Sequence, residues 1–146
     1  MGYTNGYNAY QKANVSTASQ GRLVVLLYEG AIKQLTTALS YLEGRDKVEP
    51  KNIEKFGICL QKAQQIIGEL QVSLDMEKGQ DIAKNLMSLY LFFNEELVAA
   101  NISQDRKKIE FVLNMMSQLV QSWRQVANST ANAPAAKIDN ALNIVG

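Results

Sequence analysis

Apolar residues recur at alternating steps of three and four in four successive segments of this chain, the spacing that places them on one face of an α-helix. The pattern predicts helices over about residues 20–42, 50–74, 80–101 and 104–128. No segment shows the convincing period-two alternation of a β-strand. Short turns between helices of about equal length favour an antiparallel up-down arrangement. The sequence therefore predicts an all-α four-helix bundle.

The same four stripes predict the core. In the second helix the steps alternate without a slip, which gives the seven-residue repeat of helices that pack at a shallow angle. The predicted core residues are Leu23, Leu27, Ala31, Leu35, Ala38 and Leu42 in the first helix, Ile53, Phe56, Leu60, Ala63, Ile67, Leu70 and Leu74 in the second, Ile82, Leu86, Leu89, Phe93, Leu97 and Ala100 in the third, and Ile109, Val112, Met116, Leu119, Trp123 and Val126 in the fourth.

Local signals fit these boundaries. Ser19 can cap the first helix, because its hydroxyl can accept a hydrogen bond from a first-turn amide. Pro50 suits the first turn of the second helix, because amides there have no hydrogen-bond partner within the helix and proline's lack of an amide proton costs nothing. Between the second and third helices, a charged run that ends at Gly79 predicts a loop. Asp75 and Glu77 are expected to organise that turn.

Beyond its core stripe, the third predicted helix carries a second set of apolar residues. They are Met87, Tyr90, Leu91, Phe92 and Val98. A helix that is apolar on two faces either is central in a large core or meets a partner. At 146 residues, the chain is too short for a deeply buried central helix. The pattern therefore favours a surface that binds a partner.

The sequence SLDMEKGQDIAKNLMSLY, residues 73–90, closely resembles the signature of the flagellin-specific export chaperones, the FliS family. In that family, Ser/Gly-Leu-Asp-x-Glu-x-Gly leads into Ile-Ala-x-Asn-Leu-x-x-Leu-Tyr. The stretches TASQGRLVVLLYEGAIKQL and AANISQDRKKIEFVLNMMSQLVQSW resemble its first and last long helices, so roughly residues 7–126 are covered. The family often has a proline directly after Ser19, where this chain has Gln20. That change removes a helix-start signal without abolishing the helix.

The resemblance implies a cytoplasmic export chaperone. Such a protein binds the disordered C-terminal region of flagellin, prevents premature polymerisation and delivers the subunit to the flagellar type III export gate. Physically, this is the capture of amphipathic helices along an extended apolar surface, with the cargo folding as it binds. The alternative function is a helical adaptor or self-associating structural bundle, with which regular three-four stripes are equally compatible.

The candidate flagellin contacts are the apolar residues that the core stripes leave over, together with one asparagine that matches the family pattern. They are Ile58 and Ile66 in the second helix, Asn85, Met87, Tyr90, Leu91 and Val98 in the third, and Phe111 and Met115 in the fourth. For Ile66, Tyr90 and Phe111, a position in a widened core is an equally good interpretation. Surface contact is favoured for Met87, Leu91 and Val98.

Three further residues receive mainly structural interpretations. Cys59 is another leftover apolar residue, but it is better explained as a small buried hydrophobe, since no basic pattern would activate its thiol. Asn101 could bond to a cargo backbone, and capping of a helix end is the favoured interpretation. Trp123 lies on the core stripe and is assigned to packing.

The bundle is assigned to residues 19–128, with an N-terminal arm, residues 1–18, before it. In the arm, Tyr7 and Tyr10 match a family pattern of a hydrophobic residue followed three positions later by tyrosine. The resemblance implies that these tyrosines cover the empty cargo groove and dock the loaded complex on the export-gate protein FlhA. The alternative is a short cap that seals one end of the bundle.

Residues 129–146 are expected to form a flexible tail. They begin as a low-complexity linker and end in KIDNALNIVG, where Ile138, Leu142 and Val145 fall at helical spacing. A helix this short is marginal alone in water. The three residues could imitate the cargo and occupy its groove, and a tail without function is the alternative.

Composition excludes several classes of function. A net charge of +1 without a basic tract gives no case for nucleic acid. No apolar run reaches about 18 residues, so no membrane insertion is expected. The N-terminal sequence lacks the features of a secretory signal, and the chain has 1 cysteine, which fits a reducing compartment. The expected location is therefore the cytoplasm.

The chain contains no histidine. Ser-His and Cys-His nucleophile pairs and the histidine-containing di-iron sites of helical bundles are therefore excluded. The sequence also shows no phosphate-binding loop and no dinucleotide-binding glycine pattern. We expect neither enzymatic activity nor a cofactor or metal site.

Overall fold

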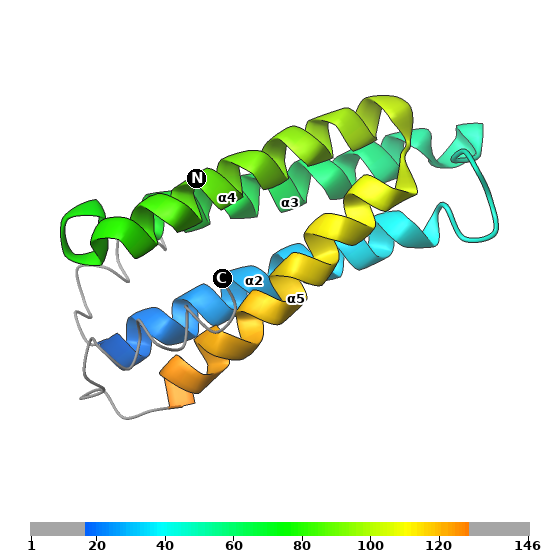
Figure 1. Cartoon of the computed structure of the whole chain (residues 1–146). Helices are drawn as coiled ribbons and strands as arrows, with labels where there is room; N and C mark the ends of the chain where they lie inside the picture. The colour runs from blue at the N-terminus through cyan, green and yellow to red at the C-terminus, as the bar shows by residue number, and fades with distance from the viewer. Residues whose placement is uncertain (1–16, 129–146) are drawn as a thin grey trace.

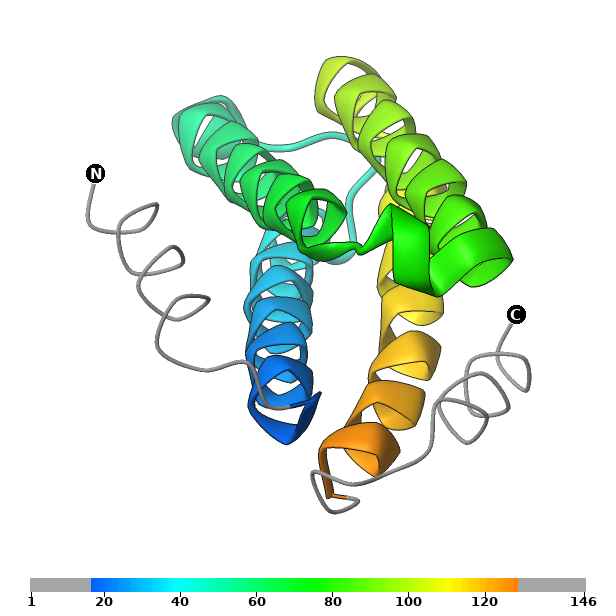
Figure 2. The same cartoon turned by 90° about the vertical axis from the view of Figure 1, so that its left-hand side faces the viewer.

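The computed structural model describes residues 17–128, which form four long helices. They are α2 (Thr17–Ser40), α3 (Ile53–Ser73), α4 (Met76–Ser103) and α5 (Arg106–Asn128), with a short 3-10 turn, η1 (Pro50–Asn52), before α3. The helices run alternately up and down (Figure 1). Seen along their axes, they occupy the corners of a square in the order α2, α3, α4, α5 (Figure 2), and each helix contacts the next. The predicted antiparallel four-helix bundle is confirmed, and the described residues contain no strand.

The buried core follows the predicted stripes closely. Leu35, Leu60, Phe93 and Ile109, one from each helix, have no exposed surface. Ile53 is an error of the prediction, because its side chain is 47% exposed. The chain enters α3 through the 3-10 turn, and Ile53 is the first residue of the helix proper. The core stripe of α3 therefore begins one step later, at the next predicted residue.

The connection from α3 to α4 is a capped turn followed by a break in the backbone. The Asp75 carboxylate accepts hydrogen bonds from the backbone amides of Glu77 (3.1 Å) and Lys78 (3.0 Å), as an N-cap should. One helical turn follows, and the backbone then leaves the helical region at Gln80, with φ 45° and ψ −123°. The predicted loop over 75–79 is thus largely helical, and the break comes one residue after Gly79.

At the other end of the bundle, side chains hold the two remaining connections together. Gln104 ends α4 in the left-handed conformation (φ 58°), and its side-chain oxygen accepts a hydrogen bond of 2.8 Å from the Val48 amide. The Arg106 guanidinium donates to the carbonyls of Leu42 and Arg45. These contacts fix the end of α4 and the start of α5 against the segment that joins α2 to α3.

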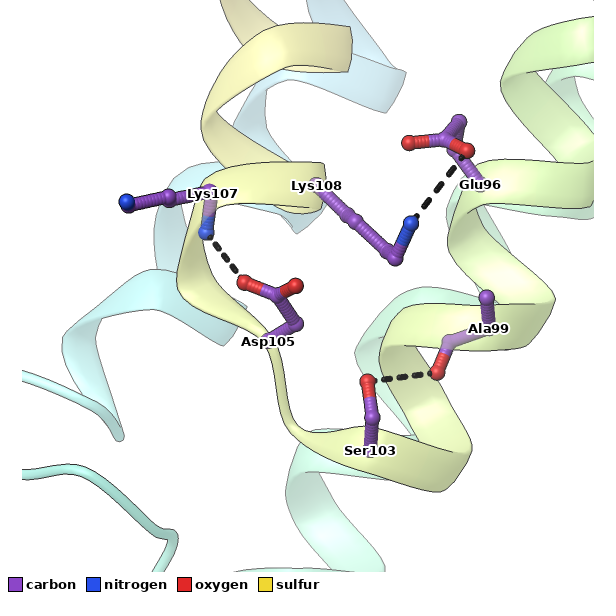
Figure 3. A network of polar contacts seen from close by, with 6 residues as sticks. All are labelled: Glu96, Ala99, Ser103, Asp105, Lys107 and Lys108. Carbon is purple, nitrogen blue, oxygen red and sulfur yellow. Dashed lines mark hydrogen bonds and ion pairs between the residues drawn. The ribbon is translucent and has the colours of Figure 1, made fainter.

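Short-range contacts around the turn between α4 and α5 are drawn in Figure 3. The Asp105 carboxylate accepts a hydrogen bond of 3.0 Å from the Lys107 amide at the start of α5. Lys108 of α5 also forms an ion pair of 3.6 Å with Glu96 of α4. The ion pair links α4 and α5 near the turn that joins them.

Candidate protein-binding surface

The outer face formed by α3 and α4 carries exposed apolar side chains. Leu91 and Val98 are 51% and 49% exposed, and their seven-residue separation places them on one face of α4. A Cβ at Gly57 of α3 would lie 3.4 Å from the side-chain oxygen of Asn101 of α4, so these parts of the two helices are side by side. Ile58, the residue after Gly57, is 41% exposed at the same level. We call Ile58, Leu91 and Val98 the α3–α4 surface.

Met87 extends this surface along α4. It lies one turn before Leu91 and is partly buried. Asn85 is exposed on the same helix. The predicted surface positions of Met87, Leu91 and Val98 therefore agree with their burial, while their contact with a partner stays a prediction.

A second apolar cluster lies between α4 and α5. Phe92 and Phe111 are each 42% exposed, and their rings meet edge to face with centroids 5.7 Å apart. Met115 follows Phe111 by one helical turn and packs partly against the core. We call Phe92, Phe111 and Met115 the α4–α5 surface. Phe92 was among the leftover residues of α4 but was not assigned to the flagellin contacts; its pairing with α5 is visible only in the fold.

Tyr90 does not belong to either surface, and its assignment as a candidate contact is corrected. It is 1% exposed, and its hydroxyl lies 2.7 Å from the hydroxyl of Tyr28 in α2. Burial raises the pKa of Tyr28 from 10.0 to about 12 and the pKa of Tyr90 well above 10.0. Both phenols are therefore neutral at physiological pH, and each satisfies the other inside the core. The wider core interpretation, left open for Tyr90, is the right one.

The remaining α3 candidates face α2. Cys59 is buried, as expected, and burial raises the pKa of its thiol, although the nearby charge of Lys62 lowers it in part. The Ile66 side chain is partly buried against the core and would lie 3.3 Å from a Cβ at Gly30. Gly30 thus gives Ile66 room to pack against α2. Little of Ile66 is left for a partner.

Asn94 and Asn101 both lie in α4. Asn101 lies against Gly57, while the C-cap of α4 is Gln104. The favoured capping role of Asn101 is therefore wrong. Among the described residues, the side-chain oxygen of Asn94 is buried and has no hydrogen-bond partner. Sequence reasoning did not single out Asn94, and only its burial reveals it.

Within residues 17–128, the cysteine, aspartate and glutamate side chains form no group of three or more that could hold a metal ion. An open polar cleft lies near the turn that joins α4 to α5, where Arg45 pairs with Glu49 at 2.7 Å and Arg106 donates to backbone carbonyls.

Two sets of predicted functional residues lie outside the described part of the chain. They are Tyr7 and Tyr10 in the N-terminal arm, and Ile138, Leu142 and Val145 near the C-terminus. Their roles stay predictions. Within residues 17–128, no helix has the length and apolar character needed to cross a membrane.

Comparisons with known proteins show the family to which the chain belongs. The family described as "Flagellar protein FliS" matches residues 3–130. The flagellar secretion chaperone FliS of Vibrio cholerae is 34% identical over 134 residues, which cover 89% of this chain and 94% of the relative. The chaperone of the same name from Salmonella typhimurium is 34% identical over 128 residues, 84% of this chain and 90% of the relative.

A third relative comes from Bacillus subtilis. The flagellar secretion chaperone FliS of Bacillus subtilis is 32% identical over 129 residues, 88% of this chain and 91% of that protein. Because the family match and the relatives all cover most of the chain, the similarity extends over the whole helical bundle. The chain therefore belongs to the FliS family, and it is a chaperone of flagellar export, not an enzyme.

Proposed function

We propose that this chaperone acts in the cytoplasm, where it binds the C-terminal region of flagellin, keeps it from polymerising and delivers it to the export gate. The observation that supports the proposal is the set of exposed apolar side chains on the α3–α4 and α4–α5 surfaces. Five large side chains between 41% and 51% exposed, on adjacent faces of one small bundle, are unusual for a protein without a partner. They are Ile58, Leu91, Phe92, Val98 and Phe111.

The binding mode follows from the shape of these surfaces. Leu91 and Val98 follow the axis of α4, so a partner helix that lies along α4 can meet both with one apolar face of its own. A C-terminal flagellin segment that is disordered before binding can wrap from the α3–α4 surface to the α4–α5 surface. The chaperone then covers the apolar faces through which flagellin subunits would otherwise associate.

Energetics favour a long interface over a single contact. Covering the remaining half of five large apolar side chains gains roughly 3–7 kcal/mol, if complete burial of each is worth about 1.5–3 kcal/mol. Association and ordering cost about 4–15 kcal/mol. The five residues alone therefore do not give tight binding. Partly buried neighbours such as Met87 and Met115 must add contacts along a wrapped cargo.

Docking at the export gate is assigned to the N-terminal arm. Tyr7 and Tyr10 lie within the residues that match the family. A tyrosine can bury its ring while its hydroxyl stays hydrogen-bonded, which suits repeated exchange between two binding sites. In the proposal, the arm covers the empty α3–α4 surface, and in the loaded complex it contacts FlhA.

The test is a calorimetric titration of the full chain with a peptide of about 40 residues from a flagellin C-terminus. A flagellin N-terminal segment serves as the control. Saturable binding with a large negative heat-capacity change, seen only with the C-terminal peptide, supports the proposal, because burial of apolar surface has that signature. Absence of binding, together with a concentration-dependent dimer in light scattering, would favour the self-associating adaptor.

A further inference from the structure

The α4–α5 surface presents two aromatic rings that are fixed against each other yet uncovered by residues 17–128. Phe92 and Phe111 meet at an interplanar angle of 89°, and each keeps 42% of its surface exposed. The ion pair between Glu96 and Lys108 lies about one turn away from both rings. The helices therefore hold the rings in one arrangement, ready to accept a small apolar face.

The same chain contains a segment of matching chemistry. The sequence continues for 18 residues beyond Asn128, the end of α5, and residues 137–146 read KIDNALNIVG. Ile138, Leu142 and Val145 would share one face of a helix. Asn140 and Asn143 would lie on the other side. The segment follows the part of the chain that matches the family, which ends at residue 130.

The length of the chain allows this segment to reach the rings. At about 1.5 Å per residue, Phe111 lies roughly 26 Å back along α5 from Asn128. Residues 129–136 can span up to roughly 26 Å, and a helix over residues 137–146 would add about 15 Å. The segment can thus turn back along α5 without a fully stretched linker. It need not cross another helix, because α4 and α5 are neighbours (Figure 2).

We propose that residues 137–146 dock as a short amphipathic helix on the α4–α5 surface of the same molecule, with Ile138, Leu142 and Val145 against Phe92 and Phe111. Tethering gives the segment an effective concentration on the order of millimolar, which offsets the weakness of so short a helix. Lys137 and Asp139 bring one charge of each sign, so they do not repel the mixed charges of the Glu96–Lys108 pair.

The docked segment regulates binding at this surface, a consequence that rests on the proposed function. A cargo that uses Phe92 and Phe111 must first displace the segment. The measured affinity is then lowered by the fraction of molecules in which the surface is free. In the empty chaperone the segment covers the two rings, and a ligand that binds the surface more tightly than the segment displaces it.

Docking is tested without cargo by paramagnetic relaxation in the full chain. A nitroxide is attached at Asn143→Cys, on the polar side of the segment, after Cys59→Ala has removed the chain's other thiol. The amides of Phe92 and Phe111 should lose more than half of their intensity, while that of Leu26, on the outer side of α2, should not. Leu142→Asp should restore the signals. Asn140→Asp, the same charge on the opposite side, should leave the broadening in place.

Broadening that is centred on α2 or α3, that is absent, or that survives Leu142→Asp would overturn the docking. The regulatory role is tested by titrating a flagellin C-terminal peptide into the full chain and into a chain that ends at Asn132. Removal of the segment should tighten binding by about three- to tenfold, and equal affinities would overturn the competition. If neither chain binds the peptide, the proposed function fails, while the relaxation experiment still decides the docking.

Discussion

Gly79, in the first turn of α4, is predicted to be required for close packing against Ala83, which lies beyond the break in the backbone at Gln80. A Cβ built at Gly79 would lie 2.6 Å from the Cβ of Ala83, whereas carbon atoms in contact are about 3.5–4.0 Å apart. Gly79→Ala would ordinarily stabilise a helix by about 1 kcal/mol. Here an overlap of roughly 1 Å must be relieved, and such overpacking costs about 1–3 kcal/mol. We expect a net loss of about 1 kcal/mol in the free energy of unfolding.

Two comparisons isolate this effect. Gly68, in α3, has open space where its Cβ would be, so Gly68→Ala should stabilise the protein by about 1 kcal/mol. In a double-mutant cycle, Ala83→Gly removes the atom that the new methyl group would meet. The pair Gly79→Ala and Ala83→Gly should therefore couple favourably by about 1–3 kcal/mol. Equilibrium unfolding in urea measures all four variants. The packing argument is refuted if Gly79→Ala stabilises as much as Gly68→Ala does, or if the coupling is zero.

The other predictions concern backbone strain and the buried tyrosines. Gln80→Gly should raise the free energy of unfolding by about 1 kcal/mol in the same urea assay, because release of about 1–3 kcal/mol of strain exceeds the entropy cost of glycine; Asp81→Gly, in regular helix, should lower it. Tyr28→Phe should cost about 1–3 kcal/mol by leaving the Tyr90 hydroxyl unpaired, and the double phenylalanine variant should cost less than the sum of the single changes. Because burial raises both tyrosine pKa values above 10.0, the unfolded chain ionises first, so stability should fall as the pH rises from about 10 to about 12. In urea unfolding at a series of pH values, the free energy of unfolding of the Tyr28→Phe/Tyr90→Phe variant should fall less steeply with pH. A slope equal to that of the parent chain would contradict the assignment of the fall to these two tyrosines.

The bundle could be predicted from the sequence because its core residues recur at regular steps of three and four. Leu35, Leu60, Phe93 and Ile109 lie on stripes of regular three-four steps, and all four are fully buried. Ile53 continued its stripe in sequence but lies at the very start of α3, where the 3-10 turn has displaced the helix start. Periodicity locates a face of a helix, and it does not show where along the helix the core ends.

The binding surface could be predicted only in part, for a related reason. Tyr90 and Leu91 are consecutive apolar residues, yet one is 1% and the other 51% exposed, because neighbouring residues on a helix point about 100° apart. The hydroxyl of Tyr90 can be buried there because it meets the hydroxyl of Tyr28 of α2. Phe92 gains its importance from Phe111, a residue of another helix. Such cross-helix pairs depend on the rotation of each helix about its axis, which spacing within one helix does not reveal.

The measurement that tests the central claim most directly compares two matched substitutions in the same titration with the flagellin C-terminal peptide. Leu91 and Leu26 are both exposed leucines, at 51% and 64%, but only Leu91 lies on the α3–α4 surface. Leu91→Asp should weaken binding by about tenfold or more, equivalent to about 1.4 kcal/mol. Leu26→Asp should change the affinity less than about twofold. Both variants should unfold at the same urea concentration as the parent chain. Equal losses from the two substitutions, or no loss from Leu91→Asp, would contradict capture of the cargo on this surface.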